Sequence, residues 1–152
     1  MADIANMPGH LIRRFQQIAV AIFHREVEAA GFDLTPVQYA ALECVARAPD
    51  IDQATLAGLI AYDRTTITGV VDRLVAKGLL TRKVNEKDRR ARTLHASDAG
   101  LDVLRRVAPS VEAAQRAMLK GLSEQEADEF LRLTRKALGA VNDLSRAPLR
   151  QR

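Results

Sequence analysis

Apolar residues recur at intervals of three and four along most of the chain, which places them on one face of a helix. This pattern predicts six helices, over residues 7–30, 35–48, 53–60, 63–77, 97–120 and 123–144. The segments that begin with Thr35 and Ser123 have the capping-box pattern, with Gln or Glu three residues later. Pro109 lies inside the fifth helix and is expected to kink it. The chain is therefore predicted to be mainly α-helical.

Between residues 80 and 96 the period changes from about 3.6 to about 2 residues, which is typical of strands. Leu80–Val84 and Arg92–Ala96 are the two predicted strands of a β-hairpin. The seven residues between them are mostly charged. A hairpin that served only to join two strands would favour a two-residue turn. The long basic tip indicates that this hairpin, a wing, reaches toward a partner.

The helix predicted over residues 63–77 has two different faces. Its apolar face carries Ile67, Val70, Val71 and Leu74, and its polar face carries Thr65, Thr68, Gly69, Asp72 and Arg73. A glycine inside a helix costs about 1 kcal/mol relative to alanine, so Gly69 suggests a need for room on the outside. Threonines, arginines and a bare glycine suit the floor of a DNA major groove. An ordinary half-buried helix fits these residues equally well.

The positive charge is concentrated in one segment. Residues 63–92 hold nine basic and four acidic side chains, a net charge of +5, whereas the rest of the chain holds 14 basic and 15 acidic ones. A contiguous basic segment is the footprint expected of a phosphate-binding surface.

Composition narrows the class of protein. The 152 residues fit one domain with a helical arm, and no apolar run approaches the roughly 20 residues that cross a bilayer. We expect no signal peptide and no membrane, and the single cysteine agrees with a reducing cytoplasm. Three scattered histidines, without a phosphate loop or metal-ligand spacing, argue against an enzyme and predict no cofactor and no metal. A helical adaptor that binds protein remains a rival interpretation.

The wing and its surroundings resemble the MarR family of bacterial transcriptional regulators. The resemblance lies in Asp88-Arg89-Arg90 followed by Leu94 and by Ser97-Asp98-Ala99-Gly100, and in the segments 34–39 and 71–80. It implies a winged helix-turn-helix domain over residues 34–98, with a recognition helix at 63–77 and a wing at 80–96. Residues 1–33 and 99–145 would be dimerisation helices, and 146–152 a frayed tail.

The resemblance implies a homodimer on double-stranded DNA, at a pseudo-palindromic operator with half-sites about 10 bp apart. The apolar stripes at 104–118 and 127–141 independently suit packing against a second chain. Repression is the default outcome in the family.

The candidate DNA contacts divide into base readers, phosphate contacts and the wing. The base readers are Arg64, Thr65, Thr66 and Thr68; the phosphate contacts are Arg73, Lys77 and Arg82; the wing contributes Asp88, Arg89 and Arg90. Arg90 resembles the family arginine that enters the minor groove, and Asp88 would orient it. Thr66 has an alternative role in capping the helix, and Asp88 one in making a turn.

The resemblance also implies a small aromatic carboxylate or phenolic effector, bound between the dimer helices and the DNA-binding lobe. Candidate residues are His10, Arg14, Gln38 and Tyr39, although salt bridges, caps or core packing would explain each of them too. Thiol-based redox sensing through Cys44 is an alternative. Its apolar neighbours Leu42, Val45 and Ala46 favour a buried cysteine instead.

Overall fold

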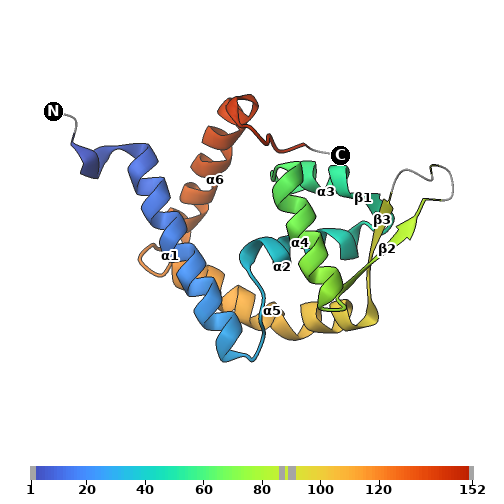
Figure 1. Ribbon diagram of the computed structural model, residues 1–152. Helices are drawn as coiled ribbons and strands as arrows, with labels where there is room; N and C mark the ends of the chain where they lie inside the picture. The colour runs from blue at the N-terminus through green and yellow to red at the C-terminus, as the bar shows by residue number, and fades with distance from the viewer. Residues whose placement is uncertain (1–2, 86–87, 89–91, 151–152) are drawn as a thin grey trace.

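The computed structural model describes residues 3–85, 88 and 92–150, and within them the predicted helices are present. The helices are α1 (Pro8–Ala29), α2 (Pro36–Arg47), α3 (Gln53–Leu59), α4 (Arg64–Ala76), α5 (Asp98–Met118) and α6 (Glu124–Val141) (Figure 1). Short 3-10 helices, η1 (Ile4–Asn6) and η2 (Asn142–Leu144), flank them. The fold is mainly α with a small antiparallel sheet, as predicted.

The helix ends follow the local signals in the sequence. In both predicted capping boxes, Thr35 with Gln38 and Ser123 with Glu126, each side chain bonds the backbone of the other residue. Gly31 and Gly78 have φ of +80° and +71°, the left-handed conformation that glycine adopts most readily after a helix. The helix α5 continues through Pro109, and the kink expected there stays a prediction.

The sheet has three strands in the order β1-β3-β2. The hairpin strands β2 (Leu80–Val84) and β3 (Arg92–Ala96) pair along their whole length, with Leu80 opposite Ala96. The third strand, β1 (Ile51–Asp52), pairs with β3 and was not predicted. Two residues are too few to show a period, so only the tertiary pairing of Ile51 with Leu94 reveals this strand.

One core joins α1 and α5 to the lobe that α2, α3, α4 and the sheet form. Leu42, Leu56, Leu74 and Leu94 are fully buried at its centre. Phe23 and Val27 of α1 belong to the same cluster as Val107 and Val111 of α5, and α1 packs along α5. The apolar stripe at 104–118, expected to await a second chain, is therefore covered largely by α1 of the same chain.

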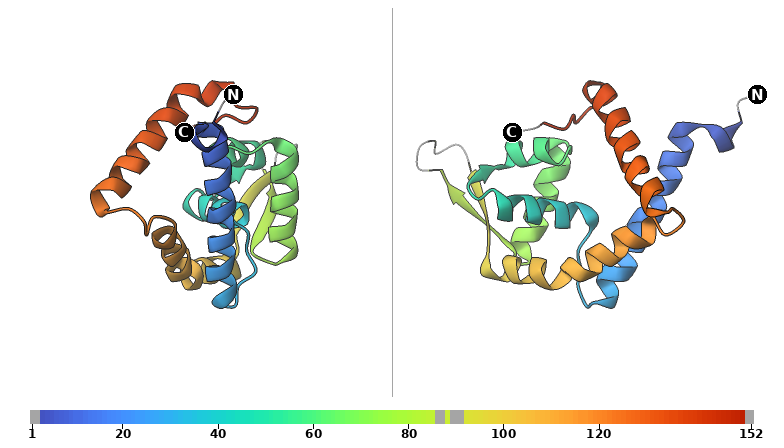
Figure 2. Two further views of the ribbon diagram at one scale, coloured as in Figure 1. Left: turned by 90° about the vertical axis from the view of Figure 1, so that its left-hand side faces the viewer. Right: turned by 180° about the vertical axis from the view of Figure 1, so that it is seen from behind.

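The arm formed by α6 and the N-terminal half of α1 stands apart from the lobe (Figures 1 and 2). No residue of α6 is buried, and its main aromatic contact is Phe130 against Phe15, with ring centroids 5.5 Å apart. The tail over residues 146–152 was predicted to be frayed, which is wrong for its described part, 146–150, because the Arg150 N–H donates to the Gly58 carbonyl at 2.9 Å. No helix in the described ranges is long and apolar enough to cross a membrane.

Candidate nucleic-acid interface

The helix α4, the predicted recognition helix, has the two faces predicted for it. Ile67, Val70, Val71 and Leu74 are 0–2% exposed and fix the helix to the core. On the opposite face Gly69 is half-buried, and the other residues named for it, Arg64, Thr65, Thr68, Asp72 and Arg73, are exposed. A Cβ built on Gly69 would meet only the Arg73 guanidinium, at 3.9 Å, so the packing of this chain does not require the glycine. Room for an approaching external surface stays the predicted reason for it.

Asp63 caps α4, and the cap involves Thr66. The Asp63 carboxylate accepts the Thr66 N–H and the Thr66 hydroxyl, each at 2.8 Å. These bonds, the backbone one foremost, hold the pKa of the Asp63 carboxyl below its ordinary value. The Thr66 hydroxyl is thus engaged in the cap, the alternative role considered for it, and we remove Thr66 from the candidate base readers.

Thr68 links α4 to α3. Its hydroxyl donates to the Arg64 carbonyl at 2.8 Å and accepts from Gln53 Nε2 at 2.7 Å. Gln53, Arg64 and Thr68 line one shallow hollow of about 280 Å³. Gln53 was missed from the sequence because its place beside α4 depends on how two helices cross. It is a further polar group at the edge of the reading face.

Two of the predicted phosphate contacts have different surroundings. Arg82 of β2 forms an ion pair with Asp72 of α4, which ties the wing to the recognition helix. Arg73 and Arg64 form no ion pair within the described part of the chain, so their charges are available to a ligand.

The wing tip lies mostly outside the described residues. Arg89 and Arg90 are among those that the structure does not describe. The backbone N–H of Asp88 donates to Asn85 Oδ1 at 3.3 Å, which fits a turn at this point. The orienting role of Asp88 toward Arg90 stays a prediction.

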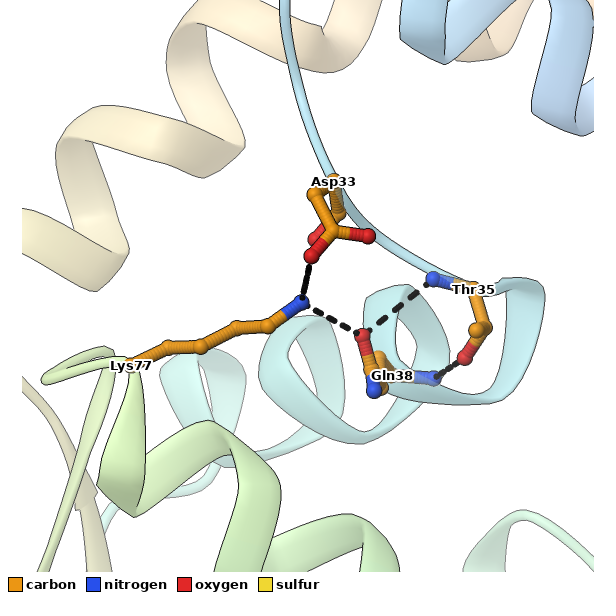
Figure 3. Close-up of polar contacts among 4 residues, drawn as sticks. All are labelled: Asp33, Thr35, Gln38 and Lys77. Carbon is orange, nitrogen blue, oxygen red and sulfur yellow. Dashed lines mark hydrogen bonds and ion pairs between the residues drawn. The ribbon is translucent and has the colours of Figure 1, made fainter.

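Lys77 does not lie as a phosphate contact would (Figure 3). Its ammonium donates to the Asp33 carbonyl at 2.5 Å, to the Asp33 carboxylate at 2.9 Å and to Gln38 Oε1 at 3.4 Å. The bond from Lys77 is the main reason that the pKa of Asp33 is lowered. The structure corrects the prediction for Lys77, since this residue ties the end of α4 to the start of α2.

The four candidate effector residues do not converge within one chain. Gln38 is 4% exposed, and its Oε1 already accepts from Thr35 and Lys77. Tyr39 is half-buried beside Phe23, at 6.1 Å between ring centroids, and burial raises its pKa. Arg14 precedes Phe23 by nine residues, about 13 Å of helix, and His10 lies farther still. These positions within one chain do not test a pocket that a second chain would complete, so the effector site stays a prediction.

Cys44 packs against the core but is only half-buried, so the burial that its apolar neighbours predicted is met in part. Over residues 3–85, 88 and 92–150, no cluster of histidine, cysteine and carboxylate groups has the arrangement of a metal site.

A helix-turn-helix, α3 and α4, followed by a hairpin on the same lobe defines a winged helix-turn-helix protein. The model of the MarR family matches residues 34–91. A regulatory protein for the hcr operon of Thauera aromatica is 30% identical over 134 residues, which cover 88% of this chain and 80% of that protein. The chain belongs to the MarR family and is a transcriptional regulator.

Solved structures agree. The PcaV transcriptional regulator of Streptomyces coelicolor, in complex with its natural ligand, is 33% identical, with a TM-score of 0.85 over 93% of this chain and 98% of that one. BpsR of Bordetella bronchiseptica, whose DNA binding is regulated by 6-hydroxynicotinic acid, is 26% identical, with a TM-score of 0.84 over 90% and 96%. These relatives are regulators rather than enzymes.

Proposed function

We propose that this regulator is a repressor that binds a pseudo-palindromic operator as a homodimer and is released by a small aromatic carboxylate or phenol. The observation that supports it best is the outer face of α4. This face is exposed, carries Arg64 and Arg73 without carboxylate partners in the described residues, and adjoins a hairpin.

On this proposal Arg64 and Thr65 read base edges in the major groove. Arginine bonds guanine bidentately, and the threonine methyl can contact thymine. Arg73 lies along the phosphates, where each neutralised phosphate adds salt-dependent affinity. The wing arginines Arg89 and Arg90 would enter the minor groove, where narrow A·T-rich DNA concentrates negative potential.

The homodimer is supported by the apolar surface that α6 and the N-terminal half of α1 leave exposed. Ile12 of α1 is 69% exposed and Leu138 of α6 is 64% exposed, within longer apolar stripes on both helices. Contiguous apolar surface of this kind marks an interface. A second copy would cover both stripes and hold two DNA-binding lobes at a fixed spacing.

The effector is proposed by analogy with BpsR, whose DNA binding is regulated by an aromatic carboxylate. In this chain Arg14 is the best receptor, because a guanidinium holds a carboxylate with two parallel bonds. Since Arg14 and His10 lie on the uncovered arm, a pocket that includes them and Tyr39 would need the second chain of the dimer.

The test is a mobility-shift assay on the DNA upstream of the regulator's own gene, repeated over a series of salt concentrations and with aromatic acids as competitors. We expect saturable binding that weakens as salt rises and that an aromatic acid reverses. A protein-binding adaptor would have no salt-dependent affinity for any duplex, and that result would end the proposal.

A further inference from the structure

The end of the chain folds back onto the DNA-binding lobe. From the top of α6 the tail crosses to α3 (Figure 1), where the Arg150 N–H donates to the Gly58 carbonyl. The Asn142 side chain also fixes the tail: it donates to the Leu149 carbonyl at 3.1 Å and accepts the Leu149 N–H at 2.8 Å. We call residues 145–150 the C-terminal arm.

Gly58 allows the arm to lie this close. A Cβ on Gly58 would be 3.2 Å from Arg150 Cβ and 3.3 Å from Arg150 Cδ, tighter than ordinary van der Waals contact. The absence of a side chain therefore brings the arginine against the surface of α3.

Between the C-terminal arm and the α3–α4 turn lies a hollow of about 450 Å³ that is rich in positive charge. Arg64, Arg146 and Arg150 line it, and the only acid among the lining residues is Asp63. Asp63 is occupied by the cap of α4. None of the three arginines pairs with a carboxylate in the described ranges. Unpaired guanidinium groups around one space form a receptor for an anion.

This hollow adjoins the face that would read DNA. Ala54 and Arg64 line both it and the shallow hollow beside Thr68. An anion held by the C-terminal arm would thus lie next to the first turn of α4. In an operator complex the anion at the edge of the major groove is a backbone phosphate.

We propose that the C-terminal arm is an additional phosphate-binding element, in which Arg146 and Arg150, together with Arg64, hold an operator phosphate beside the start of α4. The inference rests on the proposed DNA binding and extends its footprint beyond the helix-turn-helix and the wing. It predicts that the arm contributes affinity that depends on salt and not on base sequence.

The experiment compares R146Q/R150Q with the matched variant R25Q/R116Q, which loses the same two charges from α1 and α5. Fluorescence anisotropy with an operator duplex gives the affinity at several salt concentrations. Each lost phosphate contact should reduce the slope of log affinity against log salt by about 0.9. We expect R146Q/R150Q to bind roughly tenfold more weakly at low salt with a slope smaller by about 1 to 2. R25Q/R116Q should match the wild type, and R146K/R150K should recover most of the slope.

Three results would overturn the inference. An unchanged slope in R146Q/R150Q removes the arm from the DNA interface, and tighter binding would make it an inhibitory segment instead. A rise in Tm with inorganic phosphate that the double variant lacks, combined with an unchanged slope, would assign the hollow to a free anion. If the wild type binds no duplex at all, the proposed DNA binding itself is wrong. The titration of the wild type separates that outcome from a failure of the C-terminal arm proposal alone.

Discussion

At the scale of single residues, Lys77 shows how a basic side chain in a DNA-binding segment can bond to groups of its own chain instead. Its ammonium meets three oxygens, from Asp33 and Gln38, and Gln38 Oε1 also closes the capping box of α2. The Asp33 side chain is 94% exposed, so its ion pair alone would contribute little. The buried amide and the backbone carbonyl make the junction specific.

We therefore expect Lys77→Met to weaken operator binding several-fold without lowering its salt dependence, because the change misplaces α4 rather than deleting a phosphate contact. Arg73→Met, the matched variant, should reduce the slope of log affinity against log salt by about 0.9. Anisotropy titrations over the same salt series measure both. A drop of that size in Lys77→Met would restore Lys77 to the phosphate contacts.

At the scale of elements, the junction of α4, the wing and α5 explains the Ser-x-x-Gly segment after the wing. The Ser97 hydroxyl donates to the Gly78 carbonyl at 2.6 Å and accepts the Gly100 N–H at 3.0 Å, while the Ser97 N–H bonds the Leu79 carbonyl. A Cβ on Gly100 would lie 2.2 Å from the Leu79 oxygen, a backbone atom that cannot rotate away.

Gly100→Ala should destabilise the protein by about 1–3 kcal/mol, since α5 must shift away from the Leu79 backbone, just before β2, to admit the methyl group. Gly121→Ala is the control, because nothing lies within 4 Å of its added Cβ. Urea unfolding followed by circular dichroism measures both variants. Equal urea midpoints for the two variants would show that the junction admits the methyl group without loss of stability.

The elements also show what sequence can and cannot predict here. Capping boxes, glycine stops and helical stripes act over three or four residues, so the helices and their ends could be read directly. The Lys77–Asp33 bond joins residues 44 positions apart, and the Gln53–Thr68 bond joins α3 to α4. Neither leaves a local pattern. The docked C-terminal arm was missed for the same reason, as its partner Gly58 lies far upstream.

At the scale of the whole molecule, one part of the chain has its apolar surface covered and another part leaves it exposed. The apolar stripe of α5 is covered by α1, and Val107 and Ala114 are fully buried. The apolar stripe of α6 is left uncovered, since Leu131, Leu138 and Val141 are 37%, 64% and 52% exposed. The proposed dimer therefore depends on α6 and the N-terminal half of α1, and the sequence could not distinguish these stripes from that of α5.

Leu138→Glu tests this division. Burying a leucine contributes about 1.5–3 kcal/mol, and a two-fold interface would lose that contribution twice while also burying two carboxylates. We expect the variant to sediment as a monomer of 16.7 kDa at micromolar concentration and to lose most of its operator affinity. Leu101→Glu, at a site 47% exposed on α5, should remain a dimer with unchanged affinity. If Leu138→Glu stays dimeric, α6 is not the interface; if the wild type is itself a monomer, the homodimer is excluded, and with it the need for a pseudo-palindromic operator.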